Sequence, residues 1–533
     1  MAASGEVLQE ANTARRITPA DFTALALLAF MAIGAAAIGF VPVNIYSHDL
    51  FIPLDGAWRV LNGQRPHADF VTPLGPVFYL IQAGGMLLAG GTAKGLAYAS
   101  TITSTVLAAW AYLISRRRLA PAGSIAFLIF IFVLSFAPVA LGDPEPSWHT
   151  YAMIYTRWGV SLMSILVVEF FTWESGSQAG GSSTGMIWAL LLFLKINLFI
   201  VTTGLVGISL FLFWDSRRLR DIAIGFFLVA ALVAGYLRFD LFAMWRDLRM
   251  VGSARGTNVT LSFSQVALNW FSLVTTMALS LFFAAGKAAT SLPDRYRYPI
   301  LCLAVFSGGI LLQSTQFQHS GMPLGLAFAL ICCSRLWTIW KQGRGLRSLA
   351  AIVLAVYGGA FIIYSMRVDM WSIVIAGRSK YRLARPLTTP FQSDALAGFV
   401  TLGPREVTKR PIDGEWLAQY VNDGLALLRE HTSPGDSVAS LDYINPFSFA
   451  LKRAPSRGGA TWLIYGDSYS DRFKPEPSML LGTASVVMIP KWPTSVRASF
   501  EGNLRVYGPY LREHFNTAAE SKLWILEKRN QVR

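Results

Sequence analysis

Apolar windows of about twenty residues recur between residues 23 and 366, and this feature decides the class of fold. A helix rises about 1.5 Å per residue, so about 20 apolar residues are needed to cross the hydrocarbon core of a bilayer. Hydrophobic residues make up 53% of the 533-residue chain, and charged residues only 14%. The pattern predicts a polytopic α-helical membrane protein and excludes a single soluble globule.

One of the apolar windows is too long to be a single span. The window 185–214 carries Lys195 and Asn197 in its middle, which favours two short helices that meet at a polar turn. Counting this window twice gives eleven crossings. The windows are 23–43, 94–114, 123–141, 153–173, 185–214, 221–237, 266–286, 298–314, 322–340 and 348–366.

The basic residues between the windows predict the orientation. Fourteen lie on the loops of one side and six on the other, and the positive-inside rule places the richer side in the cytoplasm. That side includes Arg116, Arg117 and Arg118. The stretch 74–91 is also apolar, but counting it as a span would move these arginines outside, so we expect it to dip into the membrane or lie at its surface. The N-terminal segment 1–22 is then cytoplasmic, and the C-terminus lies outside.

The distribution of charge and of cysteine argues against a nucleic-acid-binding protein and against a protein built on disulfides or thiolate-bound metal. The formal charge is +15, but the basic residues form short clusters between apolar windows, where membrane orientation explains them better than nucleic-acid binding. Cys302, Cys332 and Cys333 all fall within predicted spans. We therefore expect neither a disulfide framework nor a thiolate metal site.

From residue 368 the composition becomes polar, which predicts an α/β domain outside the membrane over residues 368–533. GEWLAQYVNDGLALLREH predicts an amphipathic helix, followed by a Pro-Gly turn and a short strand. SVVMIPK and KLWILEK predict further strands, with a helix at 505–514 between them. No glycine-rich phosphate loop follows any of these strands, which excludes nucleotide binding.

The first outside loop, residues 44–93, is unusually polar for a segment between apolar windows. Asp49 follows the first window at the edge of an apolar wall, where a charge is costly unless it is paired or used. Asp55 and Asp69 follow it. Each aspartate can instead cap a short interfacial helix. That interpretation is as good as any other for Asp69 and weaker for Asp49.

This loop resembles the GT-C superfamily of membrane glycosyltransferases, which includes protein O-mannosyltransferases and the lipid A aminoarabinose and galacturonic acid transferases. The resemblance is specific over about residues 40–120. Many members have two adjacent acidic residues where this chain has His48-Asp49, so Asp55 stays open as a second candidate base. The matching pieces are Asp49, Gly63-Gln64, Pro66 to Phe70, Pro73 to Tyr79 and the RRRL cluster at 116–119.

The resemblance implies a GT-C-type transmembrane domain over residues 23–367, large first loop included. It also implies transfer of a hexose or pentose from a polyprenyl-phosphate donor to a glycolipid, polysaccharide or protein acceptor. The expected place is the periplasmic face of a bacterial inner membrane. The alternative is a transporter or flippase for a lipid-linked sugar. Internal repeats would favour a transporter, and the halves show no convincing self-similarity.

Such a transfer needs a base that takes the acceptor's proton and cations that receive the departing phosphate. Asp49 is the predicted base, with Asp55 as the alternative. Lys195 in midspan, Arg157 near the start of a span, and His48 beside Asp49 are predicted to bind the donor phosphate, because ionisable residues within spans usually face functional cavities. Lys195 can instead extend toward an interface.

The segment DPEPSWHTYAMIYTRWG, residues 143–159, supplies a second polar group on the outside. Asp143, Glu145 and His149 can bind a divalent cation or orient the acceptor, because such metals accept carboxylate and imidazole ligands. A solvated, proline-rich turn explains them almost equally well. Asp69 and His149 are candidate contacts for the sugar or the acceptor.

Two more segments predicted to lie outside the membrane contain candidate binding residues. In QSTQFQHSGMP, the side chains of Gln316, Gln318 and His319 can hydrogen-bond sugar hydroxyls, although a solvated turn is the better explanation for any one of them. In residues 238–265, basic residues alternate with aromatic and aliphatic ones. This second pattern predicts a helix in the lipid headgroup layer.

Overall fold

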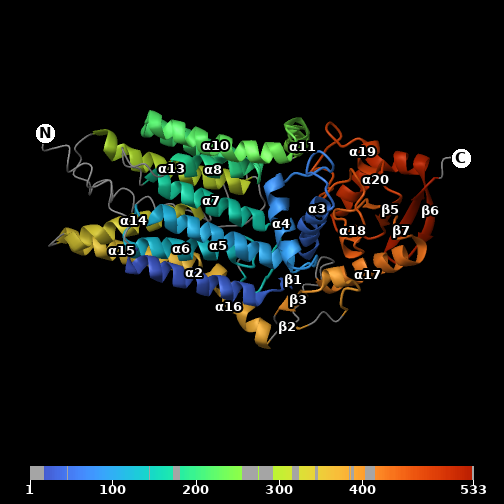
Figure 1. The fold of residues 1–533 in the computed structure, drawn as a ribbon, viewed down its shortest axis with the longest axis horizontal. Helices are drawn as coiled ribbons and strands as arrows, with labels where there is room; N and C mark the ends of the chain where they lie inside the picture. The colour runs from blue at the N-terminus through green and yellow to red at the C-terminus, as the bar shows by residue number, and fades with distance from the viewer. Residues whose placement is uncertain are drawn as a thin grey trace.

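The structure is a computed structural model in which a helical bundle joins a smaller α/β part at one end (Figure 1). Helices α3 (Phe51–Leu61) and α4 (Pro76–Leu88) lie between the two. The structure describes residues 17–44, 46–142, 145–171, 181–254, 274, 292–314, 323–342, 346–382, 384–385, 389–402 and 414–530.

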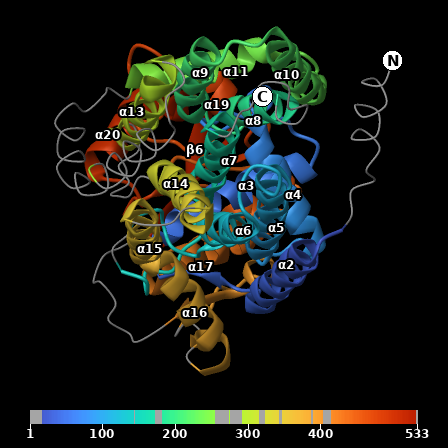
Figure 2. The same cartoon turned by 90° about the vertical axis from the view of Figure 1, so that its left-hand side faces the viewer.

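The bundle is built around α7, which contacts α5, α6, α8, α9, α13 and α14. Figure 2, which looks along the bundle, shows α7 among α6, α8 and α14. The bundle helices are α2 (Pro19–Ile38), α5 (Gly95–Ser115), α6 (Pro121–Phe136), α7 (Ile154–Phe171), α8 (Gly181–Leu192), α9 (Ile196–Leu212), α10 (Ser216–Tyr236), α13 (Leu292–Ser314), α14 (Pro323–Gln342) and α15 (Leu346–Ser365).

These helices fit a membrane protein, and each predicted window in the described ranges contains one. The window 266–286 lies outside the described residues apart from Val274. Four described helices are long and apolar enough to cross a membrane individually, namely Pro19–Ile38, Gly95–Ser115, Ser216–Tyr236 and Ser348–Ser365. Further apolar helices in the described ranges are shorter. Eleven crossings therefore stay a prediction.

The division of the 185–214 window is confirmed. α8 ends at Leu192, α9 begins at Ile196, and Lys195 is the extended residue between them. The start of helix α4 contacts this break. The backbone N–H groups of Gly75 and Val77 donate hydrogen bonds to the carbonyls of Leu194 and Phe193, each at 3.0 Å, so these carbonyls have partners outside a helix. A Cβ on Gly75 would lie 2.0 Å from one of these oxygens, so this close approach requires glycine.

The first outside loop folds into short helices. They are η1 (Ser47–Leu50), α3 (Phe51–Leu61) and α4 (Pro76–Leu88). α4 packs against α3 and α5. Its 13 residues rise about 20 Å, less than the thickness of the hydrocarbon core, which agrees with excluding the stretch 74–91 from the spans.

The C-terminal part contains a four-stranded sheet of order β4-β5-β7-β6, parallel between β4 and β5 and antiparallel elsewhere. The predicted helix and strands are confirmed. α20 begins well before the predicted residue 505, and β6 was not predicted, because its side chains are mostly exposed and show no apolar alternation. The elements are α17 (Gly414–His431), β4 (Val438–Ser440), α18 (Phe447–Ala450), α19 (Pro477–Leu481), β5 (Val486–Pro490), α20 (Arg497–His514), β6 (Phe515–Glu520) and β7 (Trp524–Arg529).

The chain between the bundle and the sheet forms helix α16 (Arg367–Arg382), which packs against α2, α6 and α15. The predicted boundary at residue 368 falls inside this helix. Beyond it, a small second sheet joins β1, which follows α2, to later segments. Its strands are β1 (Val41–Pro42), β2 (Ala384–Arg385) and β3 (Phe399–Leu402), with β3 in the middle, parallel to β1 and antiparallel to β2. The 3-10 helix η2 (Asp394–Leu396) lies between β2 and β3 in the chain.

Candidate active site

Asp49 lies in η1, where the first loop meets the C-terminal part. The hydroxyl of Tyr443 donates a hydrogen bond to Oδ1 of Asp49, and Nε2 of His48 lies 3.3 Å from the same oxygen. The side chains of His48 and Asp49 are each 13% exposed. Asp49 is thus held from one side while part of its carboxylate stays accessible.

Tyr443 reaches Asp49 because it follows β4 at the carboxyl end of that strand. The N–H of Leu441 continues the pairing with the neighbouring strand, at 2.9 Å from the carbonyl of Met488, and fixes the chain just before the tyrosine. Burial and the negative charge of Asp49 raise the pKa of Tyr443 well above its ordinary value. The phenol therefore stays protonated and donates its hydrogen bond throughout the physiological range.

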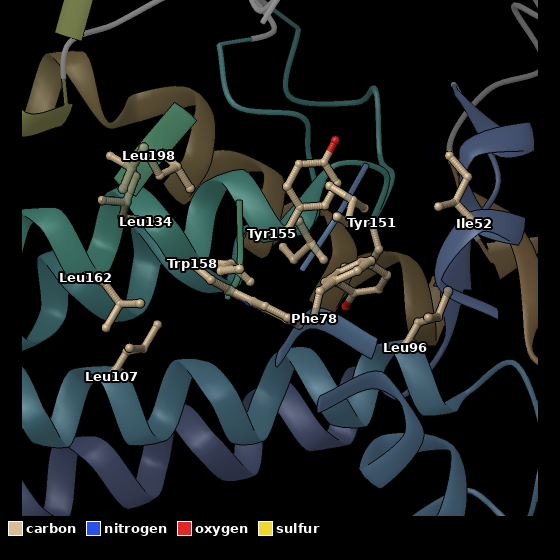
Figure 3. Close-up of a cluster of buried hydrophobic side chains, with 14 of the residues drawn as sticks. Ile52, Phe78, Leu96, Leu107, Leu134, Tyr151, Tyr155, Trp158, Leu162 and Leu198 are labelled. Atoms are coloured by element: carbon tan, nitrogen blue, oxygen red, sulfur yellow. The ribbon is translucent and has the colours of Figure 1, made fainter. Parts of the chain in front are cut away.

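Lys195 approaches the same region from the bundle. Its Nζ lies 4.7 Å from the ring centroid of Tyr155, in the first turn of α7. Tyr155 also contributes to the raised pKa of Tyr443, so the pair of Lys195 and Tyr155 faces the pair of Tyr443 and Asp49 within electrostatic range. Figure 3 shows Tyr155 among the aromatic side chains at this end of α7.

The sequence analysis did not identify Tyr443 or Tyr155. Neither carries a charge, and neither lies in a motif that the resemblance covers. Tyr443 is separated from its hydrogen-bond partner Asp49 by 394 positions along the chain. The position of Tyr443 directly after a predicted strand was the available signal, because residues at the carboxyl ends of strands commonly form sites.

Asp55 does not share the surroundings of Asp49. Its side chain is fully buried, and its Oδ2 accepts a hydrogen bond at 2.8 Å from Nε of Arg59, one helical turn on. Nη1 of Arg59 also donates to the carbonyls of Ser456 and Gly458 in the C-terminal part, at 2.8 and 2.9 Å. These contacts favour a structural role for Asp55, and its role as an alternative base stays a prediction. Asp55 fixes an arginine that joins α3 to the C-terminal part, and its i,i+4 spacing from Arg59 was visible in the sequence.

The guanidinium group of Arg157 is also paired within the protein. Its Nη2 pairs with Asp369 of α16 at 2.7 Å, and its Nε and Nη1 donate to the carbonyls of Val139 and Leu134, at 2.7 and 2.9 Å. The side chain is 1% exposed. These contacts favour a structural role for Arg157, because the unpredicted helix α16 supplies the carboxylate that compensates its charge; binding of the donor phosphate by Arg157 stays a prediction.

His149 links the loop before α7 to α16 rather than facing the site. Its Nδ1 lies 2.9 Å from the carbonyl of Ser147, and its Nε2 lies 3.1 Å from the carbonyl of Ser372. Burial lowers the pKa of His149 below its ordinary value. Glu145 accepts hydrogen bonds from the backbone and hydroxyl of Ser147, so it closes a local turn.

The predicted metal site is not seen in the described residues, where no group of three or more histidine, cysteine or acidic side chains could hold a metal ion. Asp143, the third proposed ligand, lies outside the described residues, as do Gln316, Gln318 and His319.

Asp69 caps its own turn, since its Oδ2 accepts from the backbone N–H of Arg65 at 2.8 Å. This contact agrees with the capping interpretation. Nε of Arg65 lies 3.4 Å from the same oxygen. No contact of Asp69 with Asp49 or Lys195 is present in the described part of the chain.

The predicted headgroup helix is α11 (Leu241–Ala254), and its buried face carries a contact that the sequence did not reveal. Asp247 accepts a hydrogen bond from the backbone N–H of Thr72 at 3.2 Å and lies 3.0 Å from Nδ1 of His67. Both partners belong to the first loop. The opposite face exposes Phe242 and Trp245, as a helix at a lipid surface would.

No family model and no curated protein sequence matches this chain. Solved structures similar to it include ArnT from Cupriavidus metallidurans in the apo state, at 11% identity over 95% of this chain and 98% of that one, with a TM-score of 0.42. ArnT bound to undecaprenyl phosphate has the same identity and coverage, with a TM-score of 0.46.

A third similar structure is the archaeal oligosaccharyltransferase AglB from Archaeoglobus fulgidus, in complex with an inhibitory peptide and a dolichol-phosphate. Its identity is 10% over 88% of this chain and 69% of that one, with a TM-score of 0.46. ArnT and AglB are GT-C superfamily membrane glycosyltransferases, the superfamily that the first loop resembles.

Proposed function

We propose that the protein is a membrane glycosyltransferase that moves a hexose or pentose from a polyprenyl phosphate to a hydroxyl group of an envelope glycolipid, polysaccharide or protein. The observation that carries the proposal is the carboxylate of Asp49, which Tyr443 holds in a partly exposed position, with the Lys195 ammonium group on the ring of Tyr155 as the cation from the bundle. It combines a partly exposed carboxylate with a cation at the end of an apolar bundle, where a lipid phosphate can reach both.

Asp49 is the proposed general base. Tyr443 and His48 both approach its Oδ1, and within the part of the chain that the structure describes Oδ2 accepts no hydrogen bond. Oδ2 can therefore take the proton from the acceptor hydroxyl as the acceptor oxygen bonds to the anomeric carbon of the sugar. The bond between that carbon and the phosphate oxygen breaks, and its electron pair leaves with the phosphate.

Lys195 and His48 are the proposed groups that receive the donor phosphate. A polyprenyl phosphate leaves as a stable anion, so the reaction needs positive charge near the phosphate and no strong acid. Lys195 lies at the break between α8 and α9, where its backbone is extended. The ring of Tyr155 stabilises the ammonium group without neutralising its charge.

We propose that the N-terminal segment 1–22 is cytoplasmic and that the bundle over residues 23–367 lies in a bacterial inner membrane. The first loop 44–93 and the C-terminal residues 368–533 then lie on the periplasmic face. Their contacts support a common side, since β1 pairs with β3 and the backbone of Val71 hydrogen-bonds to Gly459 and Thr461. Chain segments that pack on each other outside the bundle must lie on the same face of the membrane.

A deletion strain tests the function. Lipid and glycan analysis should show one missing sugar together with an accumulated polyprenyl-phosphate sugar, and wild-type protein should restore the product. Asp49→Asn protein, expressed at the same level, should not restore it. If the Asn variant restores the sugar fully, the transferase mechanism is wrong. If, in addition, the deletion strain accumulates the lipid-linked sugar on the cytoplasmic side alone, the transporter or flippase alternative replaces the transferase.

A further inference from the structure

Helix α11 begins where a membrane span ends. The preceding helix α10 is long and apolar enough to cross a membrane, and α11 follows it after a short turn. In that turn Arg238 and Phe239 both have a left-handed backbone, with φ of 54° and 62°, so the chain changes direction sharply. Figures 1 and 2 show α11 running across the direction of α10. A helix placed in this way lies along the membrane surface rather than through it.

The two faces of α11 have different surroundings. The buried face carries Asp247, which accepts a hydrogen bond from the backbone of the first loop. The exposed face carries Phe242, Trp245 and Arg249, whose spacing of i, i+3 and i+7 places them on one side of the helix. The side toward the lipid headgroups therefore presents two aromatic rings followed by a guanidinium group.

Arg249 is also the point at which α11 meets the C-terminal part. Its Cζ lies 4.5 Å from the ring centroid of Phe473, and the Cζ of Arg472 lies 5.3 Å from the same centroid. Both arginines are exposed, and the ring is half-buried. Two guanidinium groups from distant segments of the chain therefore meet at one ring. Arg249, Arg472 and Phe473 are here called the α11 junction.

The positive charge of the α11 junction is not balanced within the described part of the chain. Nearby Arg246 pairs with Asp247 at 3.0 Å, and Arg505 binds Asp471, the acidic neighbour of Arg472 in the chain, at 2.9 Å. Neither arginine of the junction forms an ion pair with a residue that the structure describes. The ring stabilises both cations but adds no negative charge. Two like charges at one ring repel each other, and an anion beside them removes that repulsion.

We propose that the α11 junction binds the phosphate group of an anionic phospholipid at the membrane surface. Arginine suits this ligand, because its planar fork of donors matches the oxygens of a phosphate group. A phospholipid fits better than a free phosphate, because Phe242 and Trp245 on the same helix face provide apolar surface for its acyl chains. The junction shares no residue with the proposed donor site at Asp49 and Lys195, so the proposal does not depend on sugar transfer.

The test uses the full-length protein in detergent micelles and follows its thermal unfolding as a probe is added. Dihexanoyl phosphatidylglycerol is the anionic probe, dihexanoyl phosphatidylcholine is the neutral probe with the same chains, and inorganic phosphate is the probe without chains. A ligand that binds the folded protein raises the unfolding temperature with its concentration, which gives an apparent Kd. The phosphatidylglycerol should bind at least about fivefold more tightly than either of the other probes.

Arg249→Gln and Arg472→Gln each remove one charge of the junction and keep most of the side-chain stem. Each change should raise the Kd for the phosphatidylglycerol about fivefold, which corresponds to about 1 kcal/mol for one basic residue at an anionic lipid surface. Both side chains are exposed, so neither change should prevent folding.

Arg512→Gln is the matched control. Arg512 is also exposed on the C-terminal part, in α20 just before β6. β6 begins at Phe515, which pairs with Arg529 at the edge of the sheet opposite Tyr443. This variant should leave the Kd for the phosphatidylglycerol within about twofold of wild type. Lys195→Met should also leave it unchanged, because the donor site takes no part in this binding.

Three results would overturn the proposal. The first is an equal Kd for the phosphatidylglycerol and the phosphatidylcholine, or junction variants that bind like wild type. The second is inorganic phosphate that binds as tightly as the phosphatidylglycerol, which would make the ligand a free anion. The third is weaker binding in Lys195→Met alone, which would place the probe at the donor site and leave the junction a packing contact. The deletion strain tests sugar transfer separately from all three.

Discussion

Replacing Tyr443 by Phe removes one hydroxyl group that touches the proposed base. Tyr443 is 5% exposed, and its hydroxyl donates to the carboxylate of Asp49. Hydrogen bonds to charged groups contribute about 1.5 to 3 kcal/mol, and about 1.4 kcal/mol corresponds to a tenfold change in rate. If the bond holds Asp49 in its working orientation, kcat for sugar transfer should fall by about tenfold to a hundredfold.

The chain offers a matched control for this change. Tyr469 is 1% exposed in the same C-terminal part, and its hydroxyl donates to Oδ1 of Asn503 at 2.5 Å. Tyr469→Phe therefore removes an equivalent buried hydroxyl at a position that contacts neither Asp49 nor Lys195. It should lower stability by about 0.5 to 1.5 kcal/mol, as expected for a bond to a neutral acceptor, and leave kcat within about twofold of wild type.

The assay is transfer of a labelled sugar by protein in lipid nanodiscs, with kcat and KM determined separately. A positioning role predicts a lower kcat with little change in the KM for the donor. It also predicts that Tyr443→Phe has little further effect in an Asp49→Asn background, because the group that it orients no longer acts as a base. Equal kcat values for the two Phe variants would refute the positioning role of Tyr443.

Three more predictions concern the charged residues. Asp49→Asn should lower transfer by about a hundredfold to ten-thousandfold in a folded protein, whereas Asp55→Asn should mainly lower the thermal unfolding temperature; the reverse pattern would exchange their roles. Because burial lowers the pKa of His149 in the folded state, the unfolded state binds more protons below its ordinary value of 6.5, and stability should fall as the pH drops below that value. Unfolding scans across this range should lose part of the dependence in His149→Gln. Arg157→Met should cost about 3 to 5 kcal/mol, and pairing it with Asp369→Leu should restore much of that loss; a double variant no more stable than the single one would contradict the ion-pair role.

The sequence predicted the elements whose signal is local. Apolar windows identified the bundle helices, Lys195 marked the break between α8 and α9, and short continuous apolar runs identified β5 and β7. β6 and α16 were missed because their side chains do not follow such patterns. The polar stretch that forms α16 resembles a segment outside the membrane, although its Asp369 lies against the bundle and pairs with Arg157.

Contacts between distant segments explain why the site was predicted only in part. A charge within an apolar window indicates that a partner or a function exists but does not say which. Arg157 and Lys195 gave the same signal, and only the structure shows that Asp369 compensates the first while Tyr155 contacts the second. A cation within an apolar window therefore indicates a partner in the protein more directly than it indicates a ligand.

The contacts of the first loop imply that the C-terminal part forms half of the site. Arg59 donates to Ser456 and Gly458, and the hydroxyl of Tyr79 lies 2.9 Å from Oγ1 of Thr461. These buried polar groups would lose their partners if the two segments separated, and an unpaired buried charge is costly. The same docking brings Tyr443 to Asp49. Any change that loosens this interface should therefore lower transfer through the orientation of Asp49, even where it leaves the bundle and the lipid-binding groups intact.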